Sequence, residues 1–315
     1  MPKVSVIIPV YGVEKYIERC ARSLFEQTLE DMEFIFVDDC TKDNSIEILK
    51  QTIKEYPNRQ TQIKIVRHEI NKGLPQARTT GLGYVTGEYV AHCDSDDWVD
   101  ITMYEKLYNK ATNDNLDIVI CHFYHSDGIT HTEHIHNDTS IDKTALYFEY
   151  INLWVKLVRR NIYTDNEYMP VLGAMLEDRA LSVQLTYYSN RIGILDEPLY
   201  YYFRNNGSIC HVFDEHNIVA RYEAAVKNVN LIISFLKSKE IADDYPTEIT
   251  KLKFIARHQI APITNKRKYY KLWASTFPEI NRAMLYDHKI PASQRIRFIL
   301  TSLGLFSLLR SYLSK

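Results

Sequence analysis

The first hundred residues alternate between short apolar runs and segments whose apolar positions recur at helical spacing. The apolar runs cover residues 3–10, 33–37, 62–66 and 89–93. They are rich in β-branched and aromatic residues, which is typical of buried strands. The segments with helical spacing cover residues 14–28, 46–53 and 76–85. Repeated strand–helix units of this kind predict an α/β fold with an open, mostly parallel sheet and helices on both of its faces.

Three of the predicted strands end in residues suited to binding. In chain order, these ends carry Pro9 and Tyr11, then Asp38 and Asp39, and then the polar run of residues 94–97. Ligands of open parallel sheets bind outside the carboxyl ends of the strands. The sequence therefore predicts a binding site that these three ends form together.

The run of residues 94–97 places three carboxylates within four positions at the end of the fourth strand. Like charges this close repel one another, so a positive partner is expected beside them. Asp94 and Asp96 project to the same side of an extended backbone, which suits a hard divalent cation that also binds phosphate oxygens. The alternative is that Asp97 or Asp100 caps the following helix, residues 101–111, and that the other acids are solvated.

The same strand ends offer groups for a nucleotide. Asp38 or Asp39 could accept a hydrogen bond from a base or a ribose hydroxyl, as acids at this position do in dinucleotide folds. No glycine-rich phosphate loop follows the first strand, where residues 11–14 read YGVE. A cation on the acidic run would hold the phosphates instead. Arg78 could pair with a phosphate or with the acidic run, or lie on a helix surface.

The second half of the chain predicts two more strands, residues 117–124 and a tyrosine-rich stretch at 198–209. Four histidines fall between positions 125 and 136, but the small polar residues around them favour a solvated hairpin or loop over a metal site. The basic residues of the mixed run 154–160 could steer an anionic acceptor or face water.

Helices dominate the remaining prediction. Glu177 and Asp178 open a helix that extends to Tyr188, and acids in a first turn are favourable partners of the helix dipole whatever else they do. From residue 214 onward the apolar spacing is helical. Prolines interrupt this appended region at Pro246, Pro262, Pro278 and Pro291.

Composition narrows the possible functions. The 315 residues are 45% hydrophobic and 25% charged, with a net charge of −2, so no overall basic field would attract nucleic acid. The five cysteines lack the paired spacing of a zinc site and are expected to be reduced thiols. The chain opens directly into a strand without a signal segment, so we expect a cytoplasmic protein.

The segment 294–315 needs a separate interpretation. Residues 298–309 carry no charge, and Arg295, Arg297, Arg310 and Lys315 flank them. Such a segment is shorter than the roughly 18 to 20 residues that span a bilayer, but it is long enough to lie in the interface. It would then place the protein on the inner face of the cytoplasmic membrane. The alternative is a helix that packs on the same chain or on a second subunit.

Taken together, four motifs resemble the N-terminal half of family 2 glycosyltransferases. They are SVIIPVY at 5–11, VDDCTKDNS at 37–45, NKG through AR at 71–78, and DSDDW at 94–98. The resemblance implies a GT-A fold and a sugar-nucleotide donor, commonly a UDP-sugar. Cys40 replaces the glycine that is common in the second motif.

The resemblance also implies roles for individual residues. Pro9 and Asp39 would lie against the nucleotide base, with Tyr11, Asp38, Arg78 and Ser95 in the same site. Asp94 and Asp96 would bind Mn²⁺ or Mg²⁺, with Asp96 the more direct ligand. Asp178 matches the catalytic base, and Arg204 and Ser208 match a loop that closes over the diphosphate. The reaction would be a single in-line displacement with inversion, in which a saccharide or lipid-linked hydroxyl attacks the anomeric carbon.

On this basis we expect a catalytic domain at 1–212, with a nucleotide-binding half at 1–110 and an acceptor half at 111–212, followed by a helical region at 213–315. Synthesis of a bacterial surface polysaccharide such as a capsule is the expected setting. Two alternatives stay open: a sugar nucleotidyltransferase, and a catalytically silent protein that binds nucleotide sugars.

Overall fold

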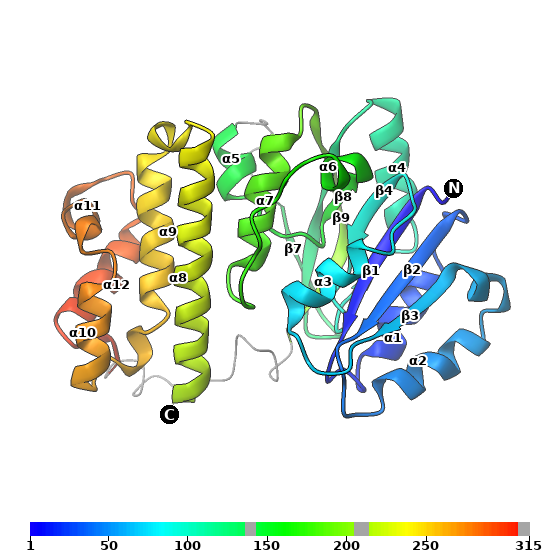
Figure 1. The fold of residues 1–315 in the computed structure, drawn as a ribbon, viewed down its shortest axis with the longest axis horizontal. Helices are drawn as coiled ribbons and strands as arrows, with labels where there is room; N and C mark the ends of the chain where they lie inside the picture. Colours follow the sequence, from blue (N-terminus) through cyan, green and yellow to red (C-terminus); the bar gives the residue numbers. More distant parts are fainter. Residues whose placement is uncertain (136–142, 205–213, 308–315) are drawn as a thin grey trace. The chain divides into compact units, whose positions relative to one another are not determined.

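The computed structural model describes residues 1–135, 143–204 and 214–307. The chain divides into two compact units. The first comprises residues 1–168 and 182–206, and the second comprises residues 169–181 and 207–315. In Figure 1 the first unit contains the sheet and the second consists mainly of helices.

Four parallel strands form one half of the sheet, in the order β3-β2-β1-β4. Their bounds are Val4–Val10 for β1, Met32–Asp38 for β2, Ile63–Arg67 for β3 and Tyr89–His92 for β4. All residues of β1 and β4 are buried, as expected of strands covered on both faces. The predicted parallel sheet is confirmed, and the observed strands agree with the predicted runs to within one or two residues.

The other half of the sheet is mixed, and it continues the order as β8-β6-β9-β5, with β7 paired to β6. The bounds are Trp98–Val99 for β5, Ile118–Ser126 for β6, His131–His134 for β7, Lys156–Arg159 for β8 and Ile192–Phe203 for β9. Strand β8, which runs antiparallel to both β4 and β6, was not predicted from the sequence. The strand predicted at 198–209 begins six residues after the observed start of β9. The pairing of β5 with β9 brings the end of β9 next to the acidic run that follows β4.

Helices flank the sheet, which confirms the predicted α/β fold (Figure 1). Those of the nucleotide half are α1 (Ile17–Phe25), α2 (Ser45–Lys54), α3 (Leu74–Leu82) and α4 (Met103–Asn113), with a 3₁₀ helix at Pro57–Gln62. Two shorter helices follow, α5 (Lys143–Phe148) and α6 (Arg160–Thr164). Helix α3 packs closely on β1, because Gly81 has no side chain to hold it away from Ile7.

Helix α7 (Glu177–Tyr188) begins with residues of the second unit and ends with residues of the first. The other helices of the second unit are α8 (Glu215–Ser238), α9 (Pro246–His258), α10 (Arg267–Ser275), α11 (Asn281–Tyr286) and α12 (Ala292–Ser302). Three short 3₁₀ helices connect them, at Ala242–Asp244, Ala261–Ile263 and Pro278–Ile280. Prolines stand at or just before several of these starts, where a missing N–H costs nothing.

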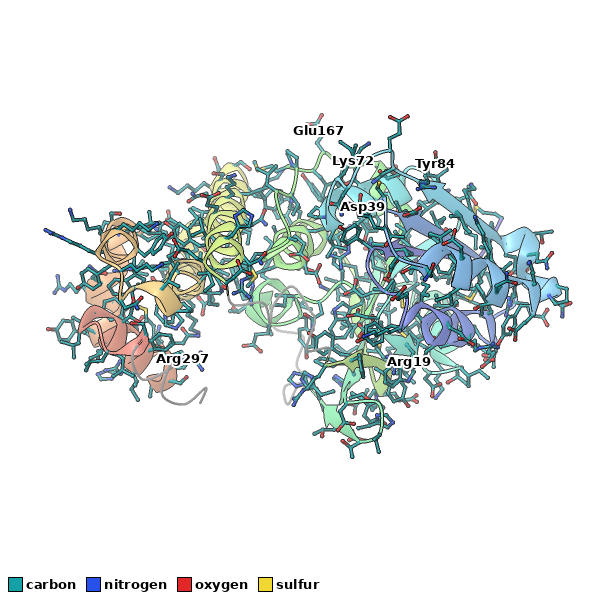
Figure 2. The ribbon with its side chains drawn as sticks, turned by 90° about the horizontal axis from the view of Figure 1, so that it is seen from below. Arg19, Asp39, Lys72, Tyr84, Glu167 and Arg297 are labelled. Carbon is teal, nitrogen blue, oxygen red and sulfur yellow. The ribbon has the colours of Figure 1, made fainter. Side chains whose placement is uncertain are left out.

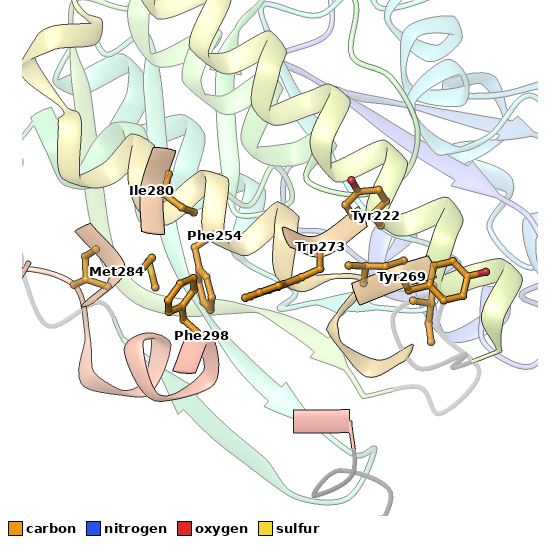
Figure 3. Close-up of a cluster of buried hydrophobic side chains, with 10 residues drawn as sticks. Tyr222, Phe254, Tyr269, Trp273, Ile280, Met284 and Phe298 are labelled. Atoms are coloured by element: carbon orange, nitrogen blue, oxygen red, sulfur yellow. The ribbon is translucent and has the colours of Figure 1, made fainter. Parts of the chain in front are cut away.

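The second unit has its own core. Figure 3 shows aromatic and aliphatic side chains from α8 to α12 packed together, including Tyr222, Phe254, Trp273 and Phe298. The Arg257 guanidinium is buried within this core, 3.8 Å from the Trp273 ring centroid, and donates to the Asn281 side chain. Among the described helices, none combines the length and apolarity needed to cross a bilayer.

The close approach of α3 to β1 predicts the effect of one substitution. The Cβ of Gly81→Ala would overlap the Ile7 side chain, so we expect a loss of about 1–3 kcal/mol in the free energy of unfolding from overpacking. Gly83→Ala is the matched control, because its Cβ would meet only the Thr80 carbonyl oxygen, at 3.3 Å. Urea denaturation checks both. Equal midpoints for the two variants would contradict the proposed packing.

Candidate active site

The acidic turn, residues 94–97, follows β4 and holds its carboxylates in two environments. The Asp97 side chain is buried and accepts two hydrogen bonds, from the Tyr200 hydroxyl and from the Phe203 backbone N–H, each at 2.7 Å. Asp94 and Asp96 stay partly exposed. Asp97 therefore belongs to the protein interior, while two carboxylates remain accessible at the end of the strand.

The alternative that Asp97 caps the following helix is wrong, because its carboxylate is directed to β9. Asp100 instead stabilises the turn that precedes α4. Its Oδ1 accepts a hydrogen bond from the Thr102 backbone N–H at 2.8 Å and another from the Thr102 hydroxyl at 2.6 Å. Burial raises the pKa of Asp97 well above its ordinary value, and the charges of Asp96 and Asp94 raise it further. The raised pKa favours the neutral form of Asp97, and the nearby carboxylates of Asp94 and Asp96 make a cation beside the turn favourable.

Arg78 supplies part of that positive charge. It lies on α3 with only 3% of its surface exposed, and its Nη2 donates to Asp94 Oδ1 at 2.9 Å. Of the three environments considered for Arg78, pairing with the acidic turn is the one observed. His92 does not share this role, because burial, and secondarily the charge of Arg78, lowers its pKa to about 3. Its imidazole is therefore neutral near pH 7.

The residues at the turn suit a divalent cation that is held mainly by a ligand's phosphates. Among the described residues, no three His, Cys, Asp or Glu side chains converge as a complete metal site. Mg²⁺ in nucleotide sites commonly takes only one or two carboxylates, with water and phosphate oxygens completing its coordination. Asp94 and Asp96 offer that donor set, and Asp94 shares its charge with Arg78. The carboxylates of Asp94 and Asp96 are thus the right type of ligand for a divalent cation, and metal binding by these residues remains a prediction.

The two acids after β2 are held by the protein itself. Asp39 is buried and accepts from His68 Nδ1 at 2.7 Å and from the backbone N–H groups of Lys72 and Gly73, both at 2.8 Å. Figure 2 labels Asp39 and Lys72 in the first unit. Asp39 thus fixes the loop that leads into α3, the helix of Arg78. A contact between Asp39 and a base remains a prediction.

Asp38 is also buried, and it accepts from the Thr41 backbone N–H at 2.9 Å. Its Oδ2 lies 3.3 Å from Arg67 Nε. These three residues line a cavity of about 410 Å³ at the end of β2 and β3.

Three other predicted residues lie at the same strand ends. Pro9 is buried within β1, beside Val37 of β2, and Tyr11 follows with a largely exposed ring. Ser95 is buried within the acidic turn. The fold therefore brings Pro9, Asp38 and the acidic turn to the carboxyl edge of neighbouring strands, as the strand pattern predicts.

One basic residue of the run at 154–160, Lys156, has a structural role that differs from both of the roles predicted for that run. Lys156 is buried in β8, where its Nζ donates to the Tyr150 carbonyl oxygen at 2.5 Å and to Ser182 Oγ at 2.7 Å. It neither faces water nor stands free to steer an acceptor. Its neighbour Trp154 stacks on Tyr200, with ring centroids 4.4 Å apart, and so packs against the residue that binds Asp97.

Arg19 is a residue that sequence analysis overlooked. Figure 2 labels Arg19, which lies on α1. Its Nη2 donates to the backbone carbonyl oxygen of Asp96 at 2.9 Å, and its guanidinium lies 3.7 Å from the Trp98 ring centroid. It also lies 4.5 Å from the Phe203 ring centroid. Arg19 thus braces the acidic turn from the helix side. In the sequence, Arg19 looks like any arginine on a helix surface. Its role follows from the pairing of β5 with β9, which are distant in the sequence.

Asp178 lies in the first turn of α7, as predicted, and is half-buried. The preceding residues are anchored within the second unit by the buried amide of Asn228 on α8. Its Oδ1 accepts from the Leu172 backbone N–H at 3.0 Å, and its Nδ2 donates to the Met175 carbonyl oxygen at 2.8 Å. The segment that leads to Asp178 is therefore held in place, while the role of Asp178 as a base remains a prediction.

The remaining predicted residues lie around β9. Arg204 is exposed, and its backbone N–H donates to the Ser126 carbonyl oxygen at 2.8 Å. Ser208 falls outside the described residues, so closure of this loop is untested. Strands β6 and β7 form a hairpin that carries His125, His131 and His134, which agrees with the predicted hairpin. His136 also falls outside the described residues.

Comparison of the sequence with known proteins finds glycosyltransferases. The family described as glycosyl transferase family 2 matches residues 5–181. The uncharacterized glycosyltransferase EpsJ of Bacillus subtilis is 32% identical over 250 residues, which cover 73% of this chain and 70% of EpsJ. The glycosyltransferase GlyA of Streptococcus pneumoniae is 30% identical over 248 residues, which cover 73% of this chain but 34% of GlyA.

Solved structures share the fold. Residues 1–349 of Staphylococcus aureus TarS superpose with a TM-score of 0.68 at 19% identity, covering 96% of this chain and 88% of that one. The same protein in complex with UDP-GlcNAc matches with a TM-score of 0.60 at 17% identity, covering 99% and 92%. The mannosyltransferase PcManGT of Pyrobaculum calidifontis, in complex with GDP-Man and Mn²⁺, matches with a TM-score of 0.57 at 14% identity, covering 96% and 87%.

The hydrogen bonds between Tyr200 and the acidic turn are expected to contribute to the free energy of unfolding. Tyr200→Phe removes the donor to Asp97 and the acceptor of the Asp94 backbone N–H, which lies 3.1 Å away. We expect a loss of about 1–3 kcal/mol, because buried polar groups would lose their partners. Tyr201→Phe, whose ring stacks on Trp98, is the control and should stay within about 0.5 kcal/mol of the original protein. Denaturant unfolding that gives both variants the same stability would refute this.

Proposed function

The chain belongs to glycosyl transferase family 2 and is therefore a glycosyltransferase, and we propose that it moves a sugar from a UDP-sugar to a saccharide or lipid-linked hydroxyl with inversion of configuration. The observation that carries this proposal is the acidic turn after β4, where Asp94 and Asp96 stay accessible beside the buried Arg78. A diphosphate and its cation need both kinds of charge at one place.

The nucleotide would bind along the ends of β1, β2 and β4. Pro9 and Asp39 would contact the base, with Tyr11, Asp38 and Ser95 in the same site. Support comes from the position of these residues at one edge of the sheet and from solved relatives of the same fold, one with UDP-GlcNAc and one with GDP-Man. The carboxylate of Asp39 already accepts hydrogen bonds from the backbone of residues 72–73, so it would contact the base and hold this loop at the same time.

Asp96, together with Asp94, would hold Mn²⁺ or Mg²⁺. When bound, the cation supplies positive charge that stabilises the departing diphosphate. Arg78 would orient Asp94, and Arg19 would hold the backbone of Asp96 through its carbonyl oxygen. Arg204, exposed at the end of β9, would add a further positive charge on the diphosphate side.

Asp178 would be the general base. It would accept the proton of the acceptor hydroxyl as that oxygen forms a bond to the anomeric carbon and the bond to the diphosphate breaks. A single displacement of this kind inverts the anomeric configuration. The fixed segment before α7, held by Asn228, would limit the mobility of Asp178 and so favour a constant position of the base.

Synthesis of a bacterial surface polysaccharide, in the cytoplasm, is the setting we propose. Relatives support it: TarS of Staphylococcus aureus is named as a poly(ribitol-phosphate) β-N-acetylglucosaminyltransferase, an enzyme that acts on a polymer. A nucleotidyltransferase is disfavoured by the residues after β1, which lack a glycine-rich phosphate loop. A silent nucleotide-sugar-binding protein would retain the site without transfer.

The metal assignment predicts the behaviour of one variant. Asp96→Ala should weaken Mn²⁺- or Mg²⁺-dependent UDP binding by about 100-fold or more, because it removes a direct ligand of the cation. Asp114→Ala, which removes an exposed acid paired with Lys110, is the control and should bind as the original protein does. Titration calorimetry with and without metal checks both. Undiminished metal-dependent affinity in Asp96→Ala would exclude Asp96 as the ligand.

The catalytic assignment predicts a different pattern for α7. Asp178→Asn should lower kcat by about 100- to 10,000-fold while UDP-sugar affinity changes little, because only the proton acceptor is lost. Glu177→Gln tests the neighbouring acid in the same helix turn and should retain most of the activity. Transfer by Asp178→Asn at the original rate would remove Asp178 from the mechanism, and loss in Glu177→Gln alone would move the base to Glu177.

A further inference from the structure

Helix α12 carries two apolar faces, of which only one is buried. Phe298 packs into the core of the second unit with Trp273, as Figure 3 shows, their ring centroids 5.7 Å apart. On another side of the helix, Ile296, Ile299 and Leu303 are 56%, 39% and 65% exposed. Their spacing of three and four residues places them in one stripe along the helix. We call these three residues the α12 stripe.

Other exposed apolar side chains lie in the same part of the chain. Leu285 and Tyr286 at the end of α11 are 38% and 71% exposed, and Leu305 follows α12 at 42%. Helix α11 packs on α12, and Arg295 Nη2 donates to the Leu285 carbonyl oxygen at 3.1 Å. Single exposed apolar residues are ordinary on a soluble surface, but several on two packed helices need a reason.

Residues 261–315 are much more positively charged than the chain as a whole. Residues 261–315 contain ten of the 38 Lys and Arg residues but only two of the 40 Asp and Glu residues. This segment therefore has eight more positive than negative charges, although the whole chain has a net charge of −2. Two of the cations, Lys266 and Lys268, pair with Glu215 of α8. Arg282, Lys289 and Arg297 are exposed near the ends or along the sides of α11 and α12.

An exposed aliphatic stripe flanked by cations is the pattern of a helix that lies in the interface of an anionic bilayer. We propose that the surface of α11 and α12, centred on the α12 stripe, docks on anionic phospholipid. The stripe would enter the boundary between headgroups and acyl chains, and the arginines and lysines would contact lipid phosphates.

The charge argues against a second copy of the chain as the occupant. A symmetric dimer formed through this surface would bring two strongly basic segments together, and like charges across an interface are unfavourable. An anionic lipid surface complements the same charges. Docking would also bring the enzyme to acceptors that are anchored in the membrane, although lipid binding itself does not depend on the proposed reaction.

Vesicle sedimentation with the full chain tests the proposal without any sugar substrate. Phosphatidylcholine vesicles containing about 30% phosphatidylglycerol should bind at least about tenfold more protein than phosphatidylcholine alone. Binding should fall when salt rises from about 0.05 to about 0.5 M, because screening weakens the electrostatic attraction.

Two variants separate the stripe from the charges. The triple variant Ile296→Ser, Ile299→Ser, Leu303→Ser should lose at least about tenfold in binding to the anionic vesicles, while its circular dichroism and unfolding midpoint stay close to the original. Arg297→Glu should weaken binding and reduce its salt dependence. The matched control is Ile70→Ser with Ile129→Ser, two exposed isoleucines of the first unit, which should bind as the original does.

Several outcomes would overturn the proposal. Equal binding to neutral and anionic vesicles would refute recognition of anionic lipid, and unchanged binding by the triple variant would remove the stripe as a lipid surface. A dimer in sedimentation velocity that the triple variant abolishes would assign the stripe to a second copy instead. Sugar transfer to a water-soluble acceptor should persist in the triple variant. If vesicle binding holds while Asp178→Asn stays fully active, the failure lies with the proposed mechanism and not with docking.

Discussion

The buried carboxylate of Asp97 is the group on which the candidate site depends. It accepts hydrogen bonds from Tyr200 and from the backbone of Phe203, and so ties the acidic turn after β4 to the end of β9. A buried acid with lost hydration is costly, and these two donors offset much of that cost. Because Asp97 is fixed inward, the neighbouring acids Asp94 and Asp96 are left toward solvent at the end of the sheet.

Two arginines, Arg78 and Arg19, contact the acidic turn. Arg78 forms an ion pair with Asp94, whereas Arg19 approaches from α1 and donates to the backbone carbonyl oxygen of Asp96. The two arginines thus reach the acidic turn from two different helices, α3 and α1. This arrangement suits a site for a metal and a diphosphate together, because carboxylates and guanidinium groups lie at one place.

The two units differ in electrostatic character, and that difference fits a division of tasks. The sheet unit carries the acids expected to handle metal and nucleotide, while residues 261–315 hold a large positive excess. The second unit is stabilised by its own aromatic core, in which the buried Arg257 lies against Trp273. That core buries one face of α12 and leaves the α12 stripe exposed. The proposed membrane docking would therefore be separable from the proposed sugar transfer.

The sequence by itself determined the alternating strands and helices of the first hundred residues, the polar strand ends and the family, because periodicity and motif residues are local properties of the chain. It did not reveal that Lys156 is buried, that β8 exists, or which of the three acids turns inward. Those depend on contacts between distant segments: Asp97 and Tyr200 are 103 residues apart, and Arg19 and Asp96 are 77 apart. Only the tertiary structure decided them, since burial and pairing of a charged group follow from what packs against it and not from its own neighbours in the sequence.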